Sequence, residues 1–134
     1  MSLASKIKII ERDKFEDSRG WFLKVLTGKE ENLPSYTGEI YLTNAAPNEA
    51  KGGHYHQEAN EWFTLITGEC EAKLVDLETG ERLSIQLSEF SPKTIYIPAS
   101  IAHIFVNKSN KDFILLAYTD QLYNPKDTIM FSEF

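Results

Sequence analysis

Three histidines and one glutamate are the residues of this chain that could together bind a metal ion. His54 and His56 are two residues apart, Glu61 follows five residues after the second, and His103 lies much later. Neutral imidazoles suit Zn, Cu, Fe or Ni, and a carboxylate adds a hard oxygen ligand. These residue types predict a site for a divalent metal ion, although ligand identity alone does not choose among these metals.

The backbone around these residues must bring them to one cavity. On an extended chain, residues i and i+2 point the same way, so His54 and His56 can face one space together. Glu61 lies at the start of the next predicted strand. His103 follows a turn at Pro98 and could enter the same cavity from a strand distant in sequence.

Short strands with frequent turns run along the whole chain. Segments such as 38–44 alternate polar and apolar residues, and no long segment has the period of an amphipathic helix. We predict an all-β jelly-roll barrel of about nine or ten short antiparallel strands. It forms a single domain over 1–134, with N-terminal strands in 6–44, the barrel with both histidine stretches in 45–118 and a C-terminal tail in 119–134.

The composition is that of a packed globular protein. The chain has 134 residues, of which 42% are hydrophobic and 12% aromatic. A net charge of −6 without a basic cluster argues against binding to nucleic acid or an anionic membrane. The single cysteine, the absence of a long apolar run and an N-terminus unlike a signal peptide predict a cytoplasmic protein.

The spacing of the four residues resembles the two signature motifs of the cupin superfamily, whose members are small jelly-roll barrels. The first motif, His-x-His-x4-Glu-x6-Gly, begins at His54, and the second, Pro-x4-His-x3-Asn, begins at Pro98. The resemblance implies that all four candidate ligands bind one metal ion. Three glycines of the motifs are replaced, by Asn48, Pro92 and Ser100.

Two further segments are similar to the dTDP-4-dehydrorhamnose 3,5-epimerases. Residues 15–22 match the pattern F-x-D-x-R-G-x-F, and residues 51–56 are similar to R-G-L-H-Y-Q, with which they share the glycine, the histidine and the tyrosine. In that family, arginines near these motifs hold the nucleotide diphosphate, and the histidine matching His54 is the general base. The resemblance implies substrate binding by Arg19 and Lys51, and we add Phe22 as a candidate for stacking on the nucleobase.

His56 separates this chain from those epimerases, which have glutamine there and use no metal. The pattern K-G-x-H-Y-H-x4-E resembles the C-terminal cupin domain of bifunctional capsular polysaccharide enzymes that reduce and epimerise UDP-sugars, and residues 118–134 are similar to its end. That domain carries zinc and catalyses 3-epimerisation, so zinc is the expected metal here, with Fe, Ni or Mn as alternatives. By analogy with these families we also expect a homodimer.

The resemblances imply an epimerase or isomerase of a nucleotide-linked 4-keto-deoxysugar in surface polysaccharide precursor synthesis. A proton beside the keto group is removed, and a metal ion stabilises the enediolate. If His54 binds the metal it is a poor base, so another residue must act as acid or base. The candidates for that role are Tyr41, Tyr96, Tyr118 and Asp120.

Three alternatives remain open at this point. The nucleotide-sugar 3,4-ketoisomerases have an R-G-x-H-A-H segment, and this resemblance makes His54 and His56 an acid and base without a metal. A non-catalytic sugar-binding cupin is the second alternative. A metal-dependent oxygenase is the third, because three histidines and one carboxylate also support that chemistry.

Overall fold

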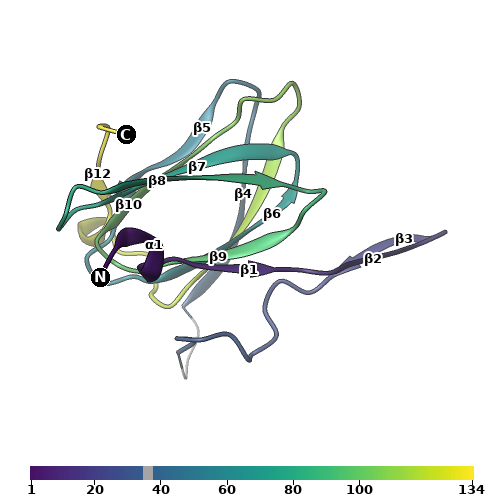
Figure 1. The fold of residues 1–134 in the computed structure, drawn as a ribbon, viewed down its shortest axis with the longest axis horizontal. Helices are drawn as coiled ribbons and strands as arrows, with labels where there is room; N and C mark the ends of the chain where they lie inside the picture. Colours follow the sequence, from purple (N-terminus) through teal and green to yellow (C-terminus); the bar gives the residue numbers. More distant parts are fainter. Residues whose placement is uncertain (35–37) are drawn as a thin grey trace.

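The computed structural model, which describes residues 1–34 and 38–134, consists mainly of two antiparallel β-sheets that face each other (Figure 1). In spatial order, the first sheet contains β1 (Lys8–Glu11), β9 (Lys93–Ile97), β6 (Glu61–Thr67), β11 (Phe113–Thr119) and β4 (Glu39–Ala45). The second contains β12 (Ile129–Met130), β5 (Ala50–Tyr55), β10 (Ile101–Val106), β7 (Glu69–Asp76) and β8 (Arg82–Ser88). The predicted antiparallel all-β fold is confirmed.

The core lies between the two sheets, where alternate residues of each strand point inward. Phe63 and Leu65 of β6 pack with Phe105 of β10 and Leu115 of β11 in this layer, and all four are almost fully buried. The rings of Phe63 and Phe105 lie 4.8 Å apart between their centroids. This core adjoins the histidine on β10, because the ring of Phe63 lies 5.4 Å from that of His103 between centroids.

The outer face of the first sheet is covered by the segment that follows β3. Trp62, Tyr96 and Tyr118 lie side by side on this face, and Leu26 and Leu33 pack over them. The aromatic cluster therefore belongs to the outside of the barrel rather than to its core. Residues 35–37 belong to the predicted N-terminal strand region 6–44 but lie outside the described residues.

A buried ion pair anchors this covering segment. The guanidinium of Arg12 contacts the carboxylate of Glu30 at 2.7 Å, and Glu30 also accepts the backbone N–H groups of Thr27 and Gly28. Burial acts to raise the pKa of Glu30, but the hydrogen bonds from Arg12 and Thr27 outweigh burial and lower the pKa to about 2. Glu30 is therefore an ionised carboxylate that caps a turn, remote from the histidines.

A two-stranded hairpin extends away from the sheets at one end of the molecule (Figure 1). It comprises β2 (Lys14–Asp17) and β3 (Gly20–Leu23), joined by a turn at Ser18 and Arg19. Phe15 and Phe22 lie directly opposite each other, and both are exposed. We call residues 14–23 the hairpin arm.

The described residues contain twelve strands, more than the nine or ten expected. β5 contains two adjacent glycines, residues that are more typical of turns than of strands. The expected C-terminal tail contains the 3-10 helix η1 (Pro125–Asp127) and strand β12, which pairs with β5. A short helix, α1 (Leu3–Lys6), opens the chain. Among the described residues, none of the helices has the length and hydrophobicity needed to span a membrane.

Candidate active site

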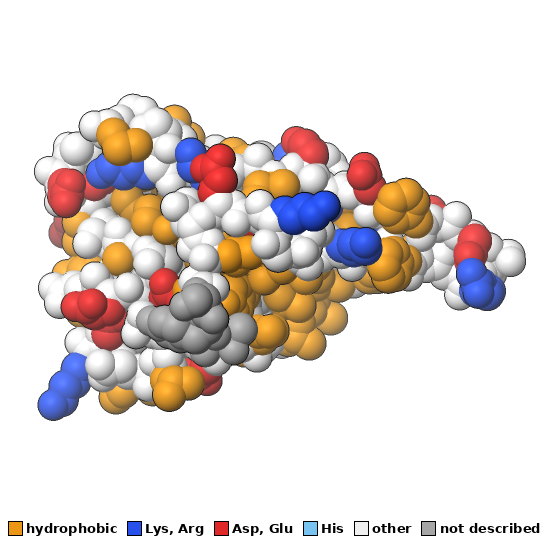
Figure 2. Space-filling view, turned by 90° about the horizontal axis from the view of Figure 1, so that it is seen from below, with side chains coloured by type: hydrophobic (Ala, Val, Ile, Leu, Met, Phe, Trp, Pro, Cys, Tyr) orange, Lys and Arg blue, Asp and Glu red, His pale blue; other side chains and the backbone are white. Residues whose placement is uncertain are grey.

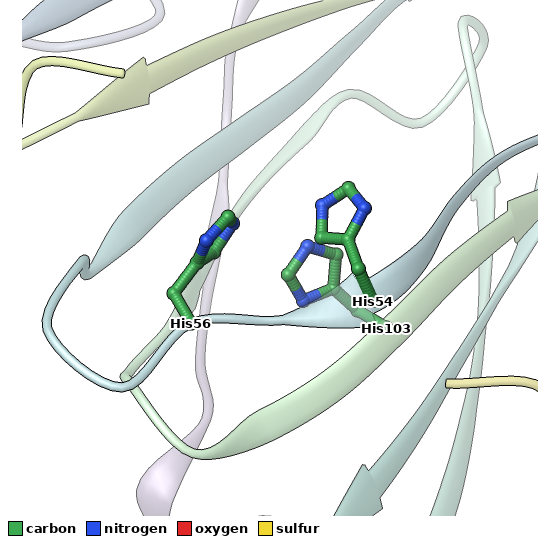
Figure 3. A group of neighbouring side chains, drawn as sticks. All are labelled: His54, His56 and His103. Carbon is green, nitrogen blue, oxygen red and sulfur yellow. The ribbon is translucent and has the colours of Figure 1, made fainter. Parts of the chain in front are cut away.

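The three histidines meet on the inner side of the second sheet, where their imidazole rings surround a common space (Figure 3). Each offers one ring nitrogen, and these nitrogens all lie within 4.8 Å of one another. The ring of His54 lies 4.9 Å from that of His56 and 5.0 Å from that of His103, between centroids. The predicted convergence of the histidine pair with the distant histidine therefore occurs in the structure.

A β-bulge in β5 sets the position of His54. His54 lies opposite His103, but Gly52 rather than Gly53 lies opposite the next residue, Ile104. Both glycines have positive φ, 98° and 81° respectively. A Cβ atom on Gly52 would lie 2.8 Å from the carbonyl oxygen of His103, so a side chain there would clash with the backbone.

The bulge also changes the face on which Lys51 lies. Lys51 pairs with Phe105, which is two residues from His103 and on the same face of β10. Lys51 therefore shares the face of His54, although residues three apart on a regular strand face opposite ways. Its side chain is exposed, and Lys51 does not line the cavity beside the histidines.

Glu61 faces the histidines from the first sheet. Its Oε1 atom lies 3.0 Å from Nε2 of His56 and 3.5 Å from Nε2 of His103. Among the described residues, no donor reaches this buried oxygen with hydrogen-bond geometry. Burial acts to raise the pKa of Glu61, but the nearby imidazoles outweigh burial and lower it, which favours the ionised carboxylate.

Two backbone carbonyl groups orient two of the imidazoles. Nδ1 of His56 lies 2.8 Å from the carbonyl oxygen of Asp127, and Nδ1 of His103 lies 3.1 Å from that of Ile101. A carbonyl oxygen only accepts, so both Nδ1 atoms carry a hydrogen. Their Nε2 atoms are then the nitrogens that face Glu61 and the common space.

The ring environments set different pKa values for the three histidines. Burial, together with the charges of His103 and His56, lowers the pKa of His54 to about 4, and burial lowers that of His103. Burial also acts to lower the pKa of His56, but its contact with the charged Glu61 outweighs burial and raises the pKa. His54 is therefore a neutral imidazole at neutral pH, as a metal ligand or a base must be.

The donor set fits a divalent transition metal. Three imidazole nitrogens and one ionised carboxylate provide the ligand types and the negative charge that zinc sites use. The unsatisfied Oε1 of Glu61 is the observation that supports this fit, because a buried ionised oxygen without a hydrogen bond is costly unless a cation is near. Glu61 lies outside the group of ligand atoms within 4.8 Å of one another, but contacts two of the three histidines.

A cavity of about 350 Å³ opens beside the histidines. Glu39 and Tyr41 of β4 form one wall, and Leu122 and Tyr123 of the C-terminal segment lie at the cavity as highly exposed side chains. The hydroxyl of Tyr41 donates to Oε2 of Glu61 at 3.3 Å. Burial and the charge of Glu61 raise the pKa of Tyr41 well above its usual value, so its hydroxyl stays protonated at neutral pH.

The structure places the other acid or base candidates elsewhere. Glu61 faces the cavity, so its neighbour Trp62 faces the opposite side of the sheet, and both Tyr96 and Tyr118 pair with Trp62. The expectation that these two tyrosines reach the cavity is therefore corrected. The carboxylate of Asp120 accepts the backbone N–H and the side-chain amide of Asn60, each at 2.9 Å, and so holds a loop behind the cavity.

Two of the predicted substrate ligands lie on the hairpin arm, away from the cavity. Arg19 forms an ion pair with Asp17 at 2.6 Å, and its side chain is 87% exposed. Phe22 is more than half exposed. Within one copy of the chain, neither side chain lines the cavity that contains the histidines.

Asp127 is a site residue that the sequence did not identify. Its carbonyl oxygen accepts a hydrogen bond from the ring of His56, and the residue lines the cavity. The turn residues Asn124 and Pro125 were the available indication of local structure, since they open η1. Nothing in the local sequence indicated that this turn packs against a loop nearly 70 residues earlier.

Comparison with known sequences identifies related proteins of polysaccharide synthesis. Residues 15–131 match the family described as the polysaccharide biosynthesis C-terminal domain. The spore coat polysaccharide biosynthesis protein SpsL of Bacillus subtilis is 27% identical over 124 residues, which are 89% of this chain and 82% of that protein. A UDP-2-acetamido-2,6-β-L-arabino-hexul-4-ose reductase of Pseudomonas aeruginosa is 22% identical over 81% of this chain, but the match covers 27% of that enzyme.

Comparison with solved structures identifies the same fold. The dTDP-6-deoxy-D-glucose-3,5-epimerase RmlC of Legionella pneumophila, in complex with dTDP-4-keto-L-rhamnose, superposes with a TM-score of 0.86 at 19% identity. The alignment covers 99% of this chain and 76% of that one. The capsular polysaccharide assembling protein CapF of Staphylococcus aureus gives a TM-score of 0.68 at 20% identity over 90% of this chain and 32% of CapF.

Proposed function

This chain belongs to the polysaccharide biosynthesis C-terminal domain family, and on that premise we propose that it is an epimerase or isomerase of a nucleotide-linked 4-keto-deoxysugar. The observation that carries the proposal is the convergence of His54, His56, His103 and Glu61 beside a cavity of about 350 Å³, with Tyr41 as a proton donor on its wall. The named activity of the RmlC relative and the named pathway of SpsL support this assignment. The reaction would serve surface polysaccharide precursor synthesis.

We propose that the three histidines and Glu61 hold a divalent metal ion, zinc foremost, with Fe, Ni or Mn as alternatives. When bound, such an ion supplies a Lewis acid that stabilises negative charge developing on the keto oxygen of the substrate. The carbonyl groups of Asp127 and Ile101 orient the rings of His56 and His103 for this purpose.

We assign the proton transfers to other residues of the cavity. The hydroxyl of Tyr41 is held by Glu61 and protonated, so it is the group we assign to return a proton to the sugar. Among the three carboxylates that line the cavity, Glu61 faces the histidines and Asp127 caps backbone N–H groups. Glu39, which accepts a hydrogen bond from the backbone N–H of Tyr123, is the carboxylate left to accept the substrate proton.

Solvent deuterium exchange tests the catalytic proposal. The purified protein, free of any histidine tag, is incubated in D₂O with a panel of UDP- and dTDP-linked 4-keto-deoxysugars. We expect deuterium to enter the carbon next to the keto group of at least one substrate. Failure to incorporate deuterium with every sugar in the panel would leave a non-catalytic sugar-binding cupin as the correct reading.

Metal analysis tests the ion independently of activity. We expect about one equivalent of metal per chain in the wild type and almost none in His103→Ala, because His103 supplies one of the nitrogens. Less than about a tenth of an equivalent in the wild type, with no further loss in His103→Ala, would contradict the metal site. Oxygen uptake with Fe(II) is the matching assay for the oxygenase alternative.

A metal-free 3,4-ketoisomerase is the second candidate function. It is favoured by the neighbouring rings of His54 and His56, which lie 4.9 Å apart and both line the cavity. In this mechanism the two histidines act as base and acid toward the sugar. Exchange or isomerisation that persists at full rate after removal of metal with a chelator would favour this function over the metal-assisted one.

A further inference from the structure

The loop between His56 and Glu61, residues 57–60, is held by two carboxylates from the C-terminal segment. Oδ1 of Asp127 accepts the N–H of Gln57 at 2.7 Å, and Oδ2 accepts the N–H of Ala59 at 3.2 Å. Both oxygens lie within 3.2 Å of the N–H nitrogen of Glu58. The carboxylate of Asp120 accepts the N–H of Asn60. Four consecutive backbone N–H groups, those of residues 57–60, therefore donate to only two carboxylates. We call residues 57–60 the site loop.

Asp127 contacts both the site loop and the imidazole that precedes it. Its carboxylate binds three N–H groups of the loop, and its carbonyl oxygen accepts Nδ1–H of His56 at 2.8 Å. Asp127 is 8% exposed, so these contacts are almost shielded from water. One residue therefore fixes the ring of His56 and the backbone to which it is attached.

Local structure holds Asp127 itself in place. It ends the 3-10 helix η1, and its N–H donates to the carbonyl oxygen of Asn124 at 2.9 Å. The Asn124 side chain accepts the N–H of Lys126 and caps the helix. The same segment continues into β12, where Met130 pairs with His54. The C-terminal segment is thus attached on both sides of the histidine pair.

We propose that Asp127 is the positioning residue of His56. Its carbonyl selects the tautomer that carries hydrogen on Nδ1, and its carboxylate holds the site loop so that Nε2 of His56 faces Glu61. The identification of His56 as a metal ligand rests on the proposed function, whereas the contacts of Asp127 with its ring and with the site loop are features of the structure. Without the carboxylate, three backbone donors lose their partner, the loop shifts, and the bond to Nδ1 weakens.

The test compares Asp127→Asn and Asp127→Ala with the wild type by two measurements. The first is the ¹⁵N chemical shifts of the His56 ring in metal-free protein, recorded at a pH where the imidazoles are neutral, which report the tautomer. The second is Co(II) affinity, followed by absorption. Glu30→Gln is the matched control, because it also alters a buried carboxylate that caps backbone N–H groups, yet Glu30 contacts none of the histidines.

In the wild type we expect His56 in one tautomer, with hydrogen on Nδ1. In Asp127→Ala we expect both tautomers and a Co(II) affinity about tenfold to a hundredfold weaker, the usual effect of losing a group that orients a ligand. Asp127→Asn keeps an acceptor oxygen and should fall between the two, and it carries the test if the alanine variant does not fold. Glu30→Gln should keep the wild-type tautomer and affinity.

An unchanged tautomer and an unchanged Co(II) affinity in folded Asp127 variants would overturn the proposal, as would an equal loss of affinity in Glu30→Gln. A wild type that binds no Co(II) would instead refute the proposed metal function. In that case the tautomer measurement decides alone. A mixture that appears only in the Asp127 variants supports the positioning role, and a wild-type tautomer in those variants contradicts it.

Discussion

Glu61 is the residue around which the chemistry of the site is arranged. It is 3% exposed, and burial acts to raise its pKa, yet the three imidazoles outweigh burial and lower it, so a negative charge lies deep in the barrel. Burying a carboxylate is costly unless hydrogen bonds or a cation compensate. Its Oε2 accepts from Tyr41, whereas its Oε1 faces His56 and His103 without hydrogen-bond geometry. This unequal environment is the reason to expect a cation beside Oε1.

The hydroxyl of Tyr41 is the proton donor of our proposal, so Tyr41→Phe should slow deuterium exchange by about a hundredfold to ten-thousandfold. The metal content should stay unchanged, because Tyr41 contacts Oε2 rather than the atom that faces the histidines. Tyr118→Phe is the control, since Tyr118 lies on the opposite face of the sheet. Equal exchange rates for wild type and Tyr41→Phe would remove Tyr41 from the mechanism.

The sequence predicted which candidate ligands lie together but not which tyrosine faces them. The convergence of His54, His56 and His103 followed from motif spacing. The choice among tyrosines depends on the phase of each strand relative to Glu61, and this phase is fixed by pairing with strands distant in sequence. Tyr96 and Tyr118 are therefore as plausible as Tyr41 until the register is known.

Among the elements, strand β5 determines the geometry of the histidine pair. The bulge at Gly52 and Gly53 shifts the register by one residue, so that His54 points inward opposite His103. Glycine occurs in turns as well as in bulges, so the sequence by itself does not distinguish a turn from a bulged strand at this position. The C-terminal tail expected over 119–134 contains strand β12, which the sequence does not reveal because β12 has only two residues and its partner strand β5 is distant in sequence.

The bulge can be tested with a pair of glycine variants. Gly52→Ala should lower the free energy of unfolding by about 2 kcal/mol or more, because it combines a φ of 98° with a Cβ atom 2.8 Å from the carbonyl oxygen of His103. Gly28→Ala should cost about 1 kcal/mol, since Gly28 also has positive φ but open space around it. Thermal unfolding and metal analysis check both variants.

The two variants should also differ at the site. Relief of the contact at Gly52 requires the backbone of His103 or of β5 to move, which displaces His54 or His103 from the common space. We therefore expect Gly52→Ala to lose metal and Gly28→Ala to retain it. A Gly52→Ala protein with wild-type stability and metal content would show that the bulge tolerates a side chain and does not set the site.

At the scale of the whole molecule, the hairpin arm is the feature that a single copy leaves unexplained. A two-stranded hairpin is marginally stable in water by itself, yet this one exposes Phe15, Trp21 and Phe22. Figure 2 shows hydrophobic side chains on the arm and on the adjoining surface of the body. Exposed apolar patches of this kind mark contact surfaces, so the arm supports the expected homodimer.

We predict that the chain is a homodimer whose interface includes the arm. Light scattering should give about twice the 15.3 kDa mass of one chain, and Phe15→Ser combined with Phe22→Ser should give a single-chain mass at the same concentration, because these two opposed side chains would lose their apolar contacts. Leu122→Ser is the control, since Leu122 is more exposed than either phenylalanine but lies at the cavity. A monomeric wild type would contradict the predicted homodimer. A variant with both serine substitutions that remains a dimer would show that the interface lies outside the hairpin arm.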